Sequence, residues 1–215
     1  MTQIKNLIPA DRTAALGSSS PWTTGLKMVF AAGEEIYAQE DEADLIYQVV
    51  RGAVRTTHLQ EDGRRQVGDF YYAGDVFGVE IGDRHRFSAE ALLDCEILVL
   101  KRSGSRAYEP GQIERLLWAA TTQELARTQA HMLLLGRTSA AEKVARFLLD
   151  LARRFGSDLV SLPMSRQDMA DYLGLTIETI SRMLGRLQAE GLVEFTGARR
   201  FRIRRESALQ SLAAA

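Results

Sequence analysis

The strongest constraint on the fold is a pair of short amphipathic segments within residues 165–191, separated by one glycine. Ser165 predicts that the first segment begins as a helix, because its hydroxyl can accept a hydrogen bond from an unpaired N–H of the first turn. Gly174 predicts the end of this helix, and Thr176 predicts the start of a second helix. Gly191 predicts the end of the second helix. Two short helices joined by a tight turn that contains glycine form a helix-turn-helix unit.

The second of these helices carries polar side chains suited to reading DNA bases. Glu178 is three residues before Ser181 and four before Arg182, so the three share one helix face. Arginine can donate to O6 and N7 of guanine, a carboxylate can accept from the cytosine amino group, and serine can reach a neighbouring base or phosphate. The alternative is that Glu178 and Arg182 form only an exposed ion pair, worth ~0.3–0.5 kcal/mol. That pair does not account for their place on the helix after the glycine turn, so we predict that these residues read bases.

Residues 192–205 predict a β-hairpin with its turn at Thr196-Gly197. Apolar residues and arginines alternate in its second half, which places the arginines on one face. Five of the 13 cationic residues after Gly136 lie within Arg199–Arg205, so we predict a wing that contacts phosphates. The alternative is a charged edge strand that blocks pairing with other chains. The residues expected at the DNA backbone are Ser165, Arg166, Thr176, Thr179, Arg186, Arg199 and Arg200.

Residues 23–108 are expected to be rich in β-strands, because short apolar or alternating segments are separated by turn signals such as Arg51-Gly52. Asp62-Gly63 between two segments indicates a hairpin, since glycine tolerates the positive φ of a type I′ turn. Short strands at regular spacing predict a β-roll or barrel. The expected strands include 28–30, 45–50, 53–57, 66–72 and 96–100.

Residues 110–136 change to a helical pattern, with Pro110 near the expected start and Gly136 at the expected end. One set of residues recurs about every 3.5 residues, the pattern by which a helix packs along a partner helix. The alternative is a helix buried within a single subunit. The predicted dimer-interface residues are Trp118, Thr121, Leu125, Thr128, Met132 and Leu135. A second apolar set, expected to face the chain's own β-roll, consists of Ile113, Leu116, Leu117 and Ala120.

A further helix is expected to begin at Ser139, with Glu142 completing a capping box, and to end at Phe155-Gly156. Residues 136–138 form the expected hinge. These assignments predict an α+β protein with a sensor-like β-roll domain at 1–108, a long central dimerisation helix at 109–136 and a winged helix-turn-helix DNA-binding domain at 137–215.

The charge of the chain agrees with this division. The total of 27 Lys+Arg and 28 Asp+Glu gives −1, but residues 1–136 carry 14 − 19 = −5 and residues 137–215 carry 13 − 9 = +4. Near neutrality therefore does not exclude a nucleic-acid partner. No apolar run approaches the ~20 residues of a membrane span, and the N-terminus has no apolar stretch of signal-peptide length. We expect no membrane association and a cytoplasmic location, which the single cysteine also fits.

The segment Glu178-Thr-Ile-Ser-Arg182 and the Leu-Gly-Arg-Leu-Gln-Ala-Glu-Gly-Leu that follows it resemble the CRP/FNR superfamily of bacterial transcription regulators. Ile177 stands where CRP-like members have arginine, which favours the FNR/FixK branch. The resemblance covers nearly the whole chain and implies a jelly roll like that of cyclic-nucleotide-binding domains. It also implies a homodimer on double-stranded DNA, in which Glu178, Ser181 and Arg182 read TTGAT-like half-sites of an inverted repeat. Such regulators recruit or block RNA polymerase, usually as activators in low-oxygen or nitrogen-oxide responses.

The sensor half departs from two patterns of this superfamily. No cysteine precedes Cys95, which excludes a four-cysteine iron–sulfur cluster held by this chain. The segment that matches the cyclic-nucleotide phosphate site has Asp75 for the glutamate, and it contains Arg86-Phe87-Ser88 in place of Arg-Ser. We therefore expect no cofactor and no cyclic-nucleotide effector, as in FixK-like members. Cys95 is expected to be a buried structural thiol rather than a redox switch.

Two alternative functions stay open. The first is an effector-gated regulator whose β-roll binds haem or another small molecule. His58, His85 and His131 show no metal-ligand spacing, and we expect ordinary surface histidines and no metal site. The second is an enzyme with its active site in the β-roll, which no nucleophile, phosphate-loop or zinc motif supports. We predict a non-enzyme.

Overall fold

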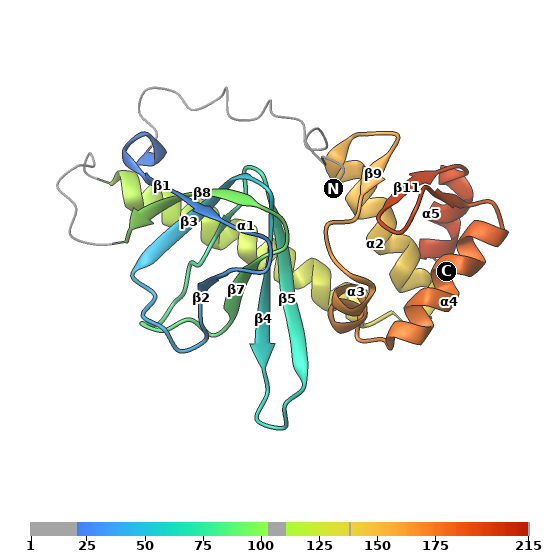
Figure 1. Cartoon of the computed structure of the whole chain (residues 1–215), viewed down its shortest axis with the longest axis horizontal. Coiled ribbons are helices and arrows are strands. Elements are labelled where there is room, and N and C mark those ends of the chain that lie inside the picture. The colour runs from blue at the N-terminus through green and yellow to red at the C-terminus, as the bar shows by residue number, and fades with distance from the viewer. Residues whose placement is uncertain (1–20, 103–110, 138, 215) are drawn as a thin grey trace. The chain divides into compact units, whose positions relative to one another are not determined.

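The computed structural model describes residues 21–102, 111–137 and 139–214. These residues form two compact units that divide within helix α1 (Gln112–Leu135), between Arg127 and Thr128 (Figure 1). The expected helix start near Pro110 and the hinge position Thr138 lie outside the described residues. Helix α1 ends immediately before Gly136, as predicted.

The first unit consists of two four-stranded antiparallel sheets, in the orders β1-β8-β3-β6 and β2-β7-β4-β5. Buried side chains of both sheets, such as Val49 and Ile97 from one and Val54 and Tyr71 from the other, meet in one core. The five expected strands are confirmed, whereas the short strands β2, β6 and β7 were not predicted. The strands are β1 (Leu26–Phe30), β2 (Glu35–Tyr37), β3 (Leu45–Arg51), β4 (Ala53–Leu59), β5 (Arg65–Tyr72), β6 (Val76–Phe77), β7 (Ser88–Ala91) and β8 (Cys95–Lys101).

The β4–β5 hairpin is present, but its turn differs from the predicted two-residue type I′ turn. The Gln60 N–H donates to the Arg64 carbonyl at 2.9 Å, and the Gly63 N–H donates to the Gln60 carbonyl at 2.9 Å. Three residues therefore lie in the loop, and Gly63 has φ +83°. This geometry fits a turn followed by a left-handed glycine, in which the glycine lets the second strand rejoin the ladder.

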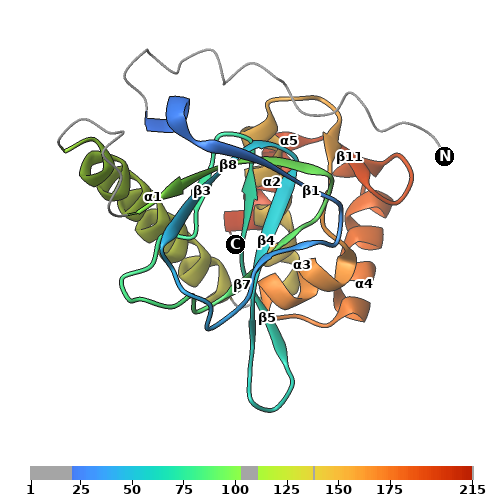
Figure 2. The same cartoon turned by 60° about the vertical axis from the view of Figure 1, so that its left-hand side comes forward.

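The first turns of α1 pack against the β-roll, as predicted for the second apolar face (Figure 2). Ile113, Leu116 and Leu117 contact a buried cluster formed by Trp22, Ile46 and Leu100. Ala120 is buried as well. Burial of this apolar surface is the main interaction that stabilises the packing of the helix against the β-roll.

Further along α1, a polar cluster replaces the apolar contacts. Arg127 Nη2 donates to Asp75 Oδ1 at 2.5 Å, and Arg127 Nη1 lies 3.5 Å from Asp69 Oδ2. The Arg127 guanidinium also lies 5.1 Å from the centroid of the Tyr71 ring, whose hydroxyl donates to Glu124 Oε1 at 3.0 Å. The side chains of Arg127 and Asp75 are only 16% and 5% exposed. A largely buried guanidinium thus fixes α1 to β5 and to the turn that follows it.

The second unit is an α+β winged helix-turn-helix. Its small sheet has the order β10-β11-β9. Its core is formed by buried apolar side chains from the helices and from β11, including Leu148, Leu173, Ile180, Phe201 and Leu209. The elements after α1 are α2 (Ala140–Phe155), β9 (Val160–Ser161), α3 (Arg166–Leu173), α4 (Ile177–Ala189), β10 (Val193–Phe195), β11 (Arg200–Ile203) and α5 (Glu206–Ala214).

The predicted fold class is confirmed: a β-roll, a long helix and a winged helix-turn-helix follow one another along the chain. Strand β9 and helix α5 were not predicted. Helix α2 has the expected ends, because the Ser139 hydroxyl accepts from the Glu142 N–H and Gly156 caps the helix with φ +57°. Among the described residues, no helix is long and apolar enough to cross a membrane.

Replacing Arg127 by methionine should lower the free energy of unfolding by ~3–5 kcal/mol, because the buried Asp75 carboxylate loses its cationic partner while the apolar volume is kept. Urea unfolding followed by tryptophan fluorescence measures the loss. The matched control is Arg115→Met, an exposed position of the same helix. An equal loss in both variants would contradict the assignment, and adding Asp75→Asn to Arg127→Met should restore part of the stability.

Candidate nucleic-acid interface

Local hydrogen bonds set the ends of the two helix-turn-helix helices. The Ser165 hydroxyl accepts from the Asp168 N–H at 3.1 Å, and the Asp168 carboxylate accepts from the Ser165 N–H at 2.9 Å. Gly174 ends α3 with φ +61°, a conformation that favours glycine. The Thr176 hydroxyl then accepts from the Thr179 N–H at 3.2 Å at the start of α4. The predicted starts of both helices and the end of α3 at Gly174 are confirmed. Helix α4 ends at Ala189 with Glu190 as its C-cap, directly before the predicted Gly191, which has φ +67°.

Helix α4 divides into a buried face and an open face. Ile180, Leu184 and Leu187 are buried against the second unit. Glu178 and Arg182 are exposed and Ser181 is half-buried, so the structure brings the three predicted base-reading residues onto the open side of one helix.

The alternative of an ion pair between Glu178 and Arg182 is not borne out, because no such pair occurs among the described residues. A hydrogen bond from its own backbone N–H, assisted by the Thr176 side chain, lowers the pKa of the Glu178 carboxyl. Glu178 therefore stays ionised and can act as an acceptor, and the Arg182 guanidinium keeps its donors available for a ligand.

Several of the residues predicted at the DNA backbone make contacts within the protein. Arg166 Nη1 donates to the Ser181 hydroxyl at 3.2 Å, which links α3 to the open face of α4. The Thr176 and Thr179 hydroxyls lie 3.1 Å apart. Arg186 Nε donates to Glu190 Oε1 at 2.7 Å, in an exposed pair that solvent screens.

The predicted hairpin turns at Gly197, where the Thr196 N–H donates to the Arg200 carbonyl at 2.9 Å. Arg199 and Arg200 are exposed, whereas Phe201 is fully buried, so the predicted alternation holds at these residues. The alternative of an edge strand is wrong for β11. Its Arg200 and Phe201 pair with β9 as its other side pairs with β10, so β11 is the central strand.

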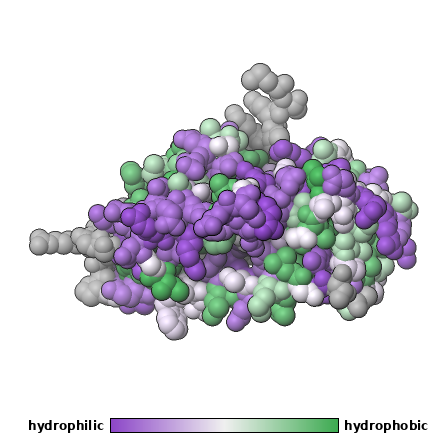
Figure 3. Space-filling model, turned by 90° about the horizontal axis from the view of Figure 1, so that it is seen from below, coloured by the Kyte–Doolittle hydropathy of each residue, from purple (hydrophilic) through white to green (hydrophobic). Residues whose placement is uncertain are grey.

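The predicted dimer-interface residues lie mostly on the surface of α1. Trp118, Leu125 and Met132 are 78%, 56% and 64% exposed. Thr121 and Thr128 are exposed too. The alternative of a helix buried within one subunit is therefore wrong for this face. On the face of the molecule drawn in Figure 3, hydrophobic residues are exposed in several places between hydrophilic ones.

Leu135 differs from the other five residues of this set. It is half-buried, and its Cδ2 lies 3.5 Å from where a Cβ on Gly174 would stand. The last residue of α1 therefore packs on the α3–α4 turn of its own chain.

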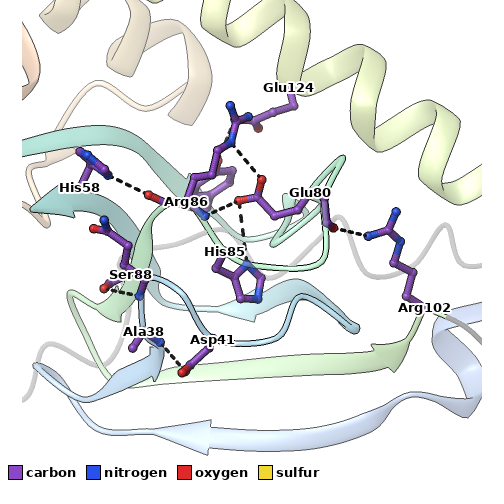
Figure 4. Close-up of polar contacts among 12 residues, drawn as sticks. Ala38, Asp41, His58, Glu80, His85, Arg86, Ser88, Arg102 and Glu124 are labelled. Atoms are coloured by element: carbon purple, nitrogen blue, oxygen red, sulfur yellow. Dashed lines mark hydrogen bonds and ion pairs between the residues drawn. The ribbon is translucent and has the colours of Figure 1, made fainter.

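In the segment expected to resemble a phosphate site, the cationic Arg86 pairs with a carboxylate of the same segment. Glu80, not Asp75, is the carboxylate beside Arg86: Glu80 Oε1 accepts from the Arg86 N–H at 3.1 Å, and Oε2 lies 3.3 Å from Arg86 Nε (Figure 4). Asp75 instead binds Arg127. A phosphate at Arg86 would lie next to the Glu80 carboxylate, and like charges at that range oppose binding. A phosphate could reach Arg86, whose side chain is 74% exposed, only by displacing Glu80.

Of the three histidines, His85 contradicts the expectation of a surface residue. Its side chain is fully buried, and its ring stacks on Tyr37 with the centroids 3.7 Å apart. Its Nδ1 lies 4.0 Å from Glu80 Oε1, and neither ring nitrogen has a hydrogen-bond partner among the described residues. His58 and His131 each bond a backbone carbonyl. The sequence around His85 has no clear period, so its burial was not predictable.

The expected burial of Cys95 is confirmed. Its side chain is fully buried, and its thiol contacts the Ala53 and Leu93 carbonyls at 3.3 and 3.0 Å. Burial raises the pKa of this thiol, which disfavours the reactive thiolate. Within the part of the chain that the structure describes, no cluster of His, Cys, Asp and Glu could hold a metal ion.

Residues 27–107 match the cyclic nucleotide-binding domain family, and residues 142–212 match the Crp-like helix-turn-helix domain family. The nitrogen fixation regulation protein FixK of Azorhizobium caulinodans is 46% identical over 212 residues, which cover 95% of this chain and 82% of that protein. FixK of Rhizobium meliloti is 44% identical over 188 residues, 87% of each chain. The solved structure of FixK2 from Bradyrhizobium japonicum aligns with a TM-score of 0.83 and 46% identity, over 89% of this chain and 98% of that chain. These relatives are named as regulators and not as enzymes, in agreement with the prediction.

Burial lowers the pKa of His85, against the opposing effect of Glu80, Asp41 and Asp44. The folded state therefore binds this proton less readily than the unfolded state, whose histidine titrates near ~6.5. The free energy of unfolding should fall as the pH drops below ~6.5, by about 1.4 kcal/mol per unit of pKa difference. His85→Phe, which keeps the stacked ring, should flatten this dependence in urea titrations between about pH 5 and 8.

The control for this experiment is His58→Phe, at a position that is only half-buried. His85→Phe should flatten the pH dependence more than this control does. An unchanged slope in His85→Phe would show that other groups cause the dependence.

Proposed function

This chain belongs to the FixK-like branch of the CRP/FNR superfamily of transcription regulators, and from that premise we propose that it binds, as a homodimer, an inverted repeat with TTGAT-like half-sites. The observation that carries the proposal is the open face of α4, where Glu178, Ser181 and Arg182 lie together. The exposed arginine supplies the donors that guanine requires, and the ionised glutamate supplies an acceptor for cytosine.

The carboxylate of Glu178 restricts how this face can meet DNA. An ionised carboxylate is repelled by phosphates, so it favours a position at base edges in the major groove, where amino groups donate. Arg166 supports this geometry, because its hydrogen bond to Ser181 orients the hydroxyl between the two charged residues. We propose that Arg166 contacts the backbone and holds Ser181 at the same time.

Phosphate contacts would position the helix in the groove without reading sequence. Arg199 and Arg200, exposed at the tip of the β10–β11 hairpin, are the strongest candidates. Arg186 would reach the backbone by exchanging its Glu190 partner for a phosphate. The remaining candidates for backbone contact, at the starts of α3 and α4, are Ser165, Thr176 and Thr179.

The exposed side chains of α1 support a dimer, because Trp118, Leu125 and Met132 would leave water if two helices packed along this face. Thr121 and Thr128 lie between them. Leu135 is half-buried in its own chain, so only the exposed part of its side chain could contact the partner helix. Two-fold symmetry would then present two copies of α4 to half-sites one helical turn apart, ~34–36 Å.

We further propose that the protein is a cytoplasmic activator that recruits RNA polymerase in low-oxygen or nitrogen-oxide-related control. Relatives named for nitrogen fixation regulation support this assignment. The internal pairing of Glu80 with Arg86 supports control without a cyclic nucleotide at that segment.

Arg182→Ala should weaken binding to a TTGAT/ATCAA inverted repeat by ~1–3 kcal/mol, because a two-pronged contact to guanine is lost. Fluorescence anisotropy with this duplex and with a duplex altered at the guanine measures the change. Arg199→Ala is the comparison: loss of a phosphate contact should weaken both duplexes equally and reduce the salt dependence. Unchanged discrimination between the duplexes in Arg182→Ala would refute direct reading by this residue.

Leu125→Glu should convert the dimer into monomers, because it places a charge in the middle of the proposed helix–helix contact. Sedimentation velocity at micromolar concentration measures the change. The matched control is Ile81→Glu, which makes the same exchange at a 90% exposed position of the β-roll. If Leu125→Glu sediments like the unchanged protein, as the Ile81→Glu control should, the result would count against this dimer interface.

A further inference from the structure

The carbonyl end of α3 is capped by side chains from two other helices. The last four carbonyls of a helix have no partner within it, and they carry the negative end of its dipole. In α3, the Ala170 carbonyl accepts from the backbone of the α3–α4 turn. The Tyr172 carbonyl lies 2.7 Å from His131 Nε2 of α1, and the Leu173 carbonyl accepts from Lys143 Nζ of α2 at 3.3 Å.

His131 makes a second contact with the same residue. Its ring stacks on the Tyr172 ring with centroids 3.9 Å apart and planes within 5°. Because a carbonyl can only accept, the His131 Nε2 atom must carry the proton in this bond. His131 thus contacts both the backbone and the ring of Tyr172, and the ring also packs against Phe147 of α2 with the centroids 5.7 Å apart.

A further contact lies one helical turn later on the same face of α1. Residues four apart share a helix face, so His131 and Leu135 point to the same side. Leu135 packs beside Gly174, at the turn between α3 and α4. All these residues belong to the compact unit that begins at Thr128. The last turns of α1 are therefore built into the helix-turn-helix.

This arrangement connects the two surfaces of the proposed function. Leu125 and Met132 of α1 are exposed for the proposed partner helix, whereas His131 faces α3. The contacts of His131 and Leu135 therefore bear on the angle between the last turns of α1 and the helix-turn-helix. In a symmetric dimer, that angle determines how far apart the two copies of α4 lie.

We propose that His131 is a positioning residue that holds the recognition helix at a fixed angle to the dimer helix and thereby makes the dimer select one half-site spacing. The proposal rests on the proposed function, because it requires a dimer that reads two half-sites. It differs from a purely stabilising role, which would change affinity for every duplex alike. A selective role changes the ratio of affinities between spacings.

The test compares four duplexes with the full-length protein. One carries the inverted repeat at the preferred spacing, two have the spacer lengthened by one or two base pairs, and one carries a single half-site. Each added base pair moves a half-site by ~3.4 Å and rotates it by roughly 34°. His131→Ala removes the ring and the donor, His131→Phe keeps a stacking ring, and His131→Gln keeps a donor. The control is Gln123→Ala, at an exposed position of the same helix away from the face of Leu125 and Met132.

We expect the preference of the unchanged protein for one spacing to fall roughly tenfold in His131→Ala, as for loss of one well-placed hydrogen bond and its stacking. His131→Phe and His131→Gln should lie between the two, and Gln123→Ala should match the unchanged protein. Affinity for the single half-site should not change. Sedimentation velocity and thermal melting test whether each variant is dimeric and folded. If His131→Ala does not fold, the comparison is made with His131→Phe and His131→Gln.

Two results would overturn the inference. One is an unaltered spacing preference in folded, dimeric His131 variants, and the other is an equal loss on all four duplexes. A different result would overturn the proposed function itself: no preference of the unchanged protein for TTGAT half-sites over a scrambled duplex. The two failures are therefore distinguishable.

Discussion

The structure depends on how helix α1 divides its surface among three environments. Its first turns bury apolar side chains against Trp22, Ile46 and Leu100, and Arg127 then replaces apolar contact by a buried ion pair. An unpaired guanidinium would not stay in such a place, because burial of a charge is costly without a partner. Asp75 therefore helps to fix the rotation of the helix about its axis. Once that rotation is fixed, Trp118 and Leu125 have no place in this chain's core.

The same principle governs the charges of the β-roll. A binding site for an anion needs cationic groups whose partners are missing until the ligand arrives. Arg86 has the Glu80 carboxylate, and Arg127 has Asp75 and Asp69. The chain retains a domain that matches the cyclic nucleotide-binding family. In this domain the carboxylates of Glu80, Asp75 and Asp69 pair with the two arginines.

Local rules in the sequence predicted the DNA-reading unit better than the sensor half. The ends of α3 and α4 depend on Ser165, Gly174 and Thr176, whose effects act within four residues. The β-strands followed from alternation, but sheet order depends on pairing between distant segments. The loop that holds Glu80 and His85 has neither period, so the burial of His85 came only from the structure. Leu135 shows the limit of periodicity, because its place in the seam pattern does not reveal that α3 lies beside it.

The two ends of α3 show why part of a recognition geometry escapes local rules. Ser165 and Asp168 cap its beginning from within the same turn, so the cap is visible in the sequence. Its other end depends on His131, 41 residues away along the chain. A helix end satisfied by its own turn can move with that turn. A helix end satisfied by another helix is held at a fixed place relative to that helix. In the proposed dimer on two half-sites, this constraint relates one recognition helix to the other.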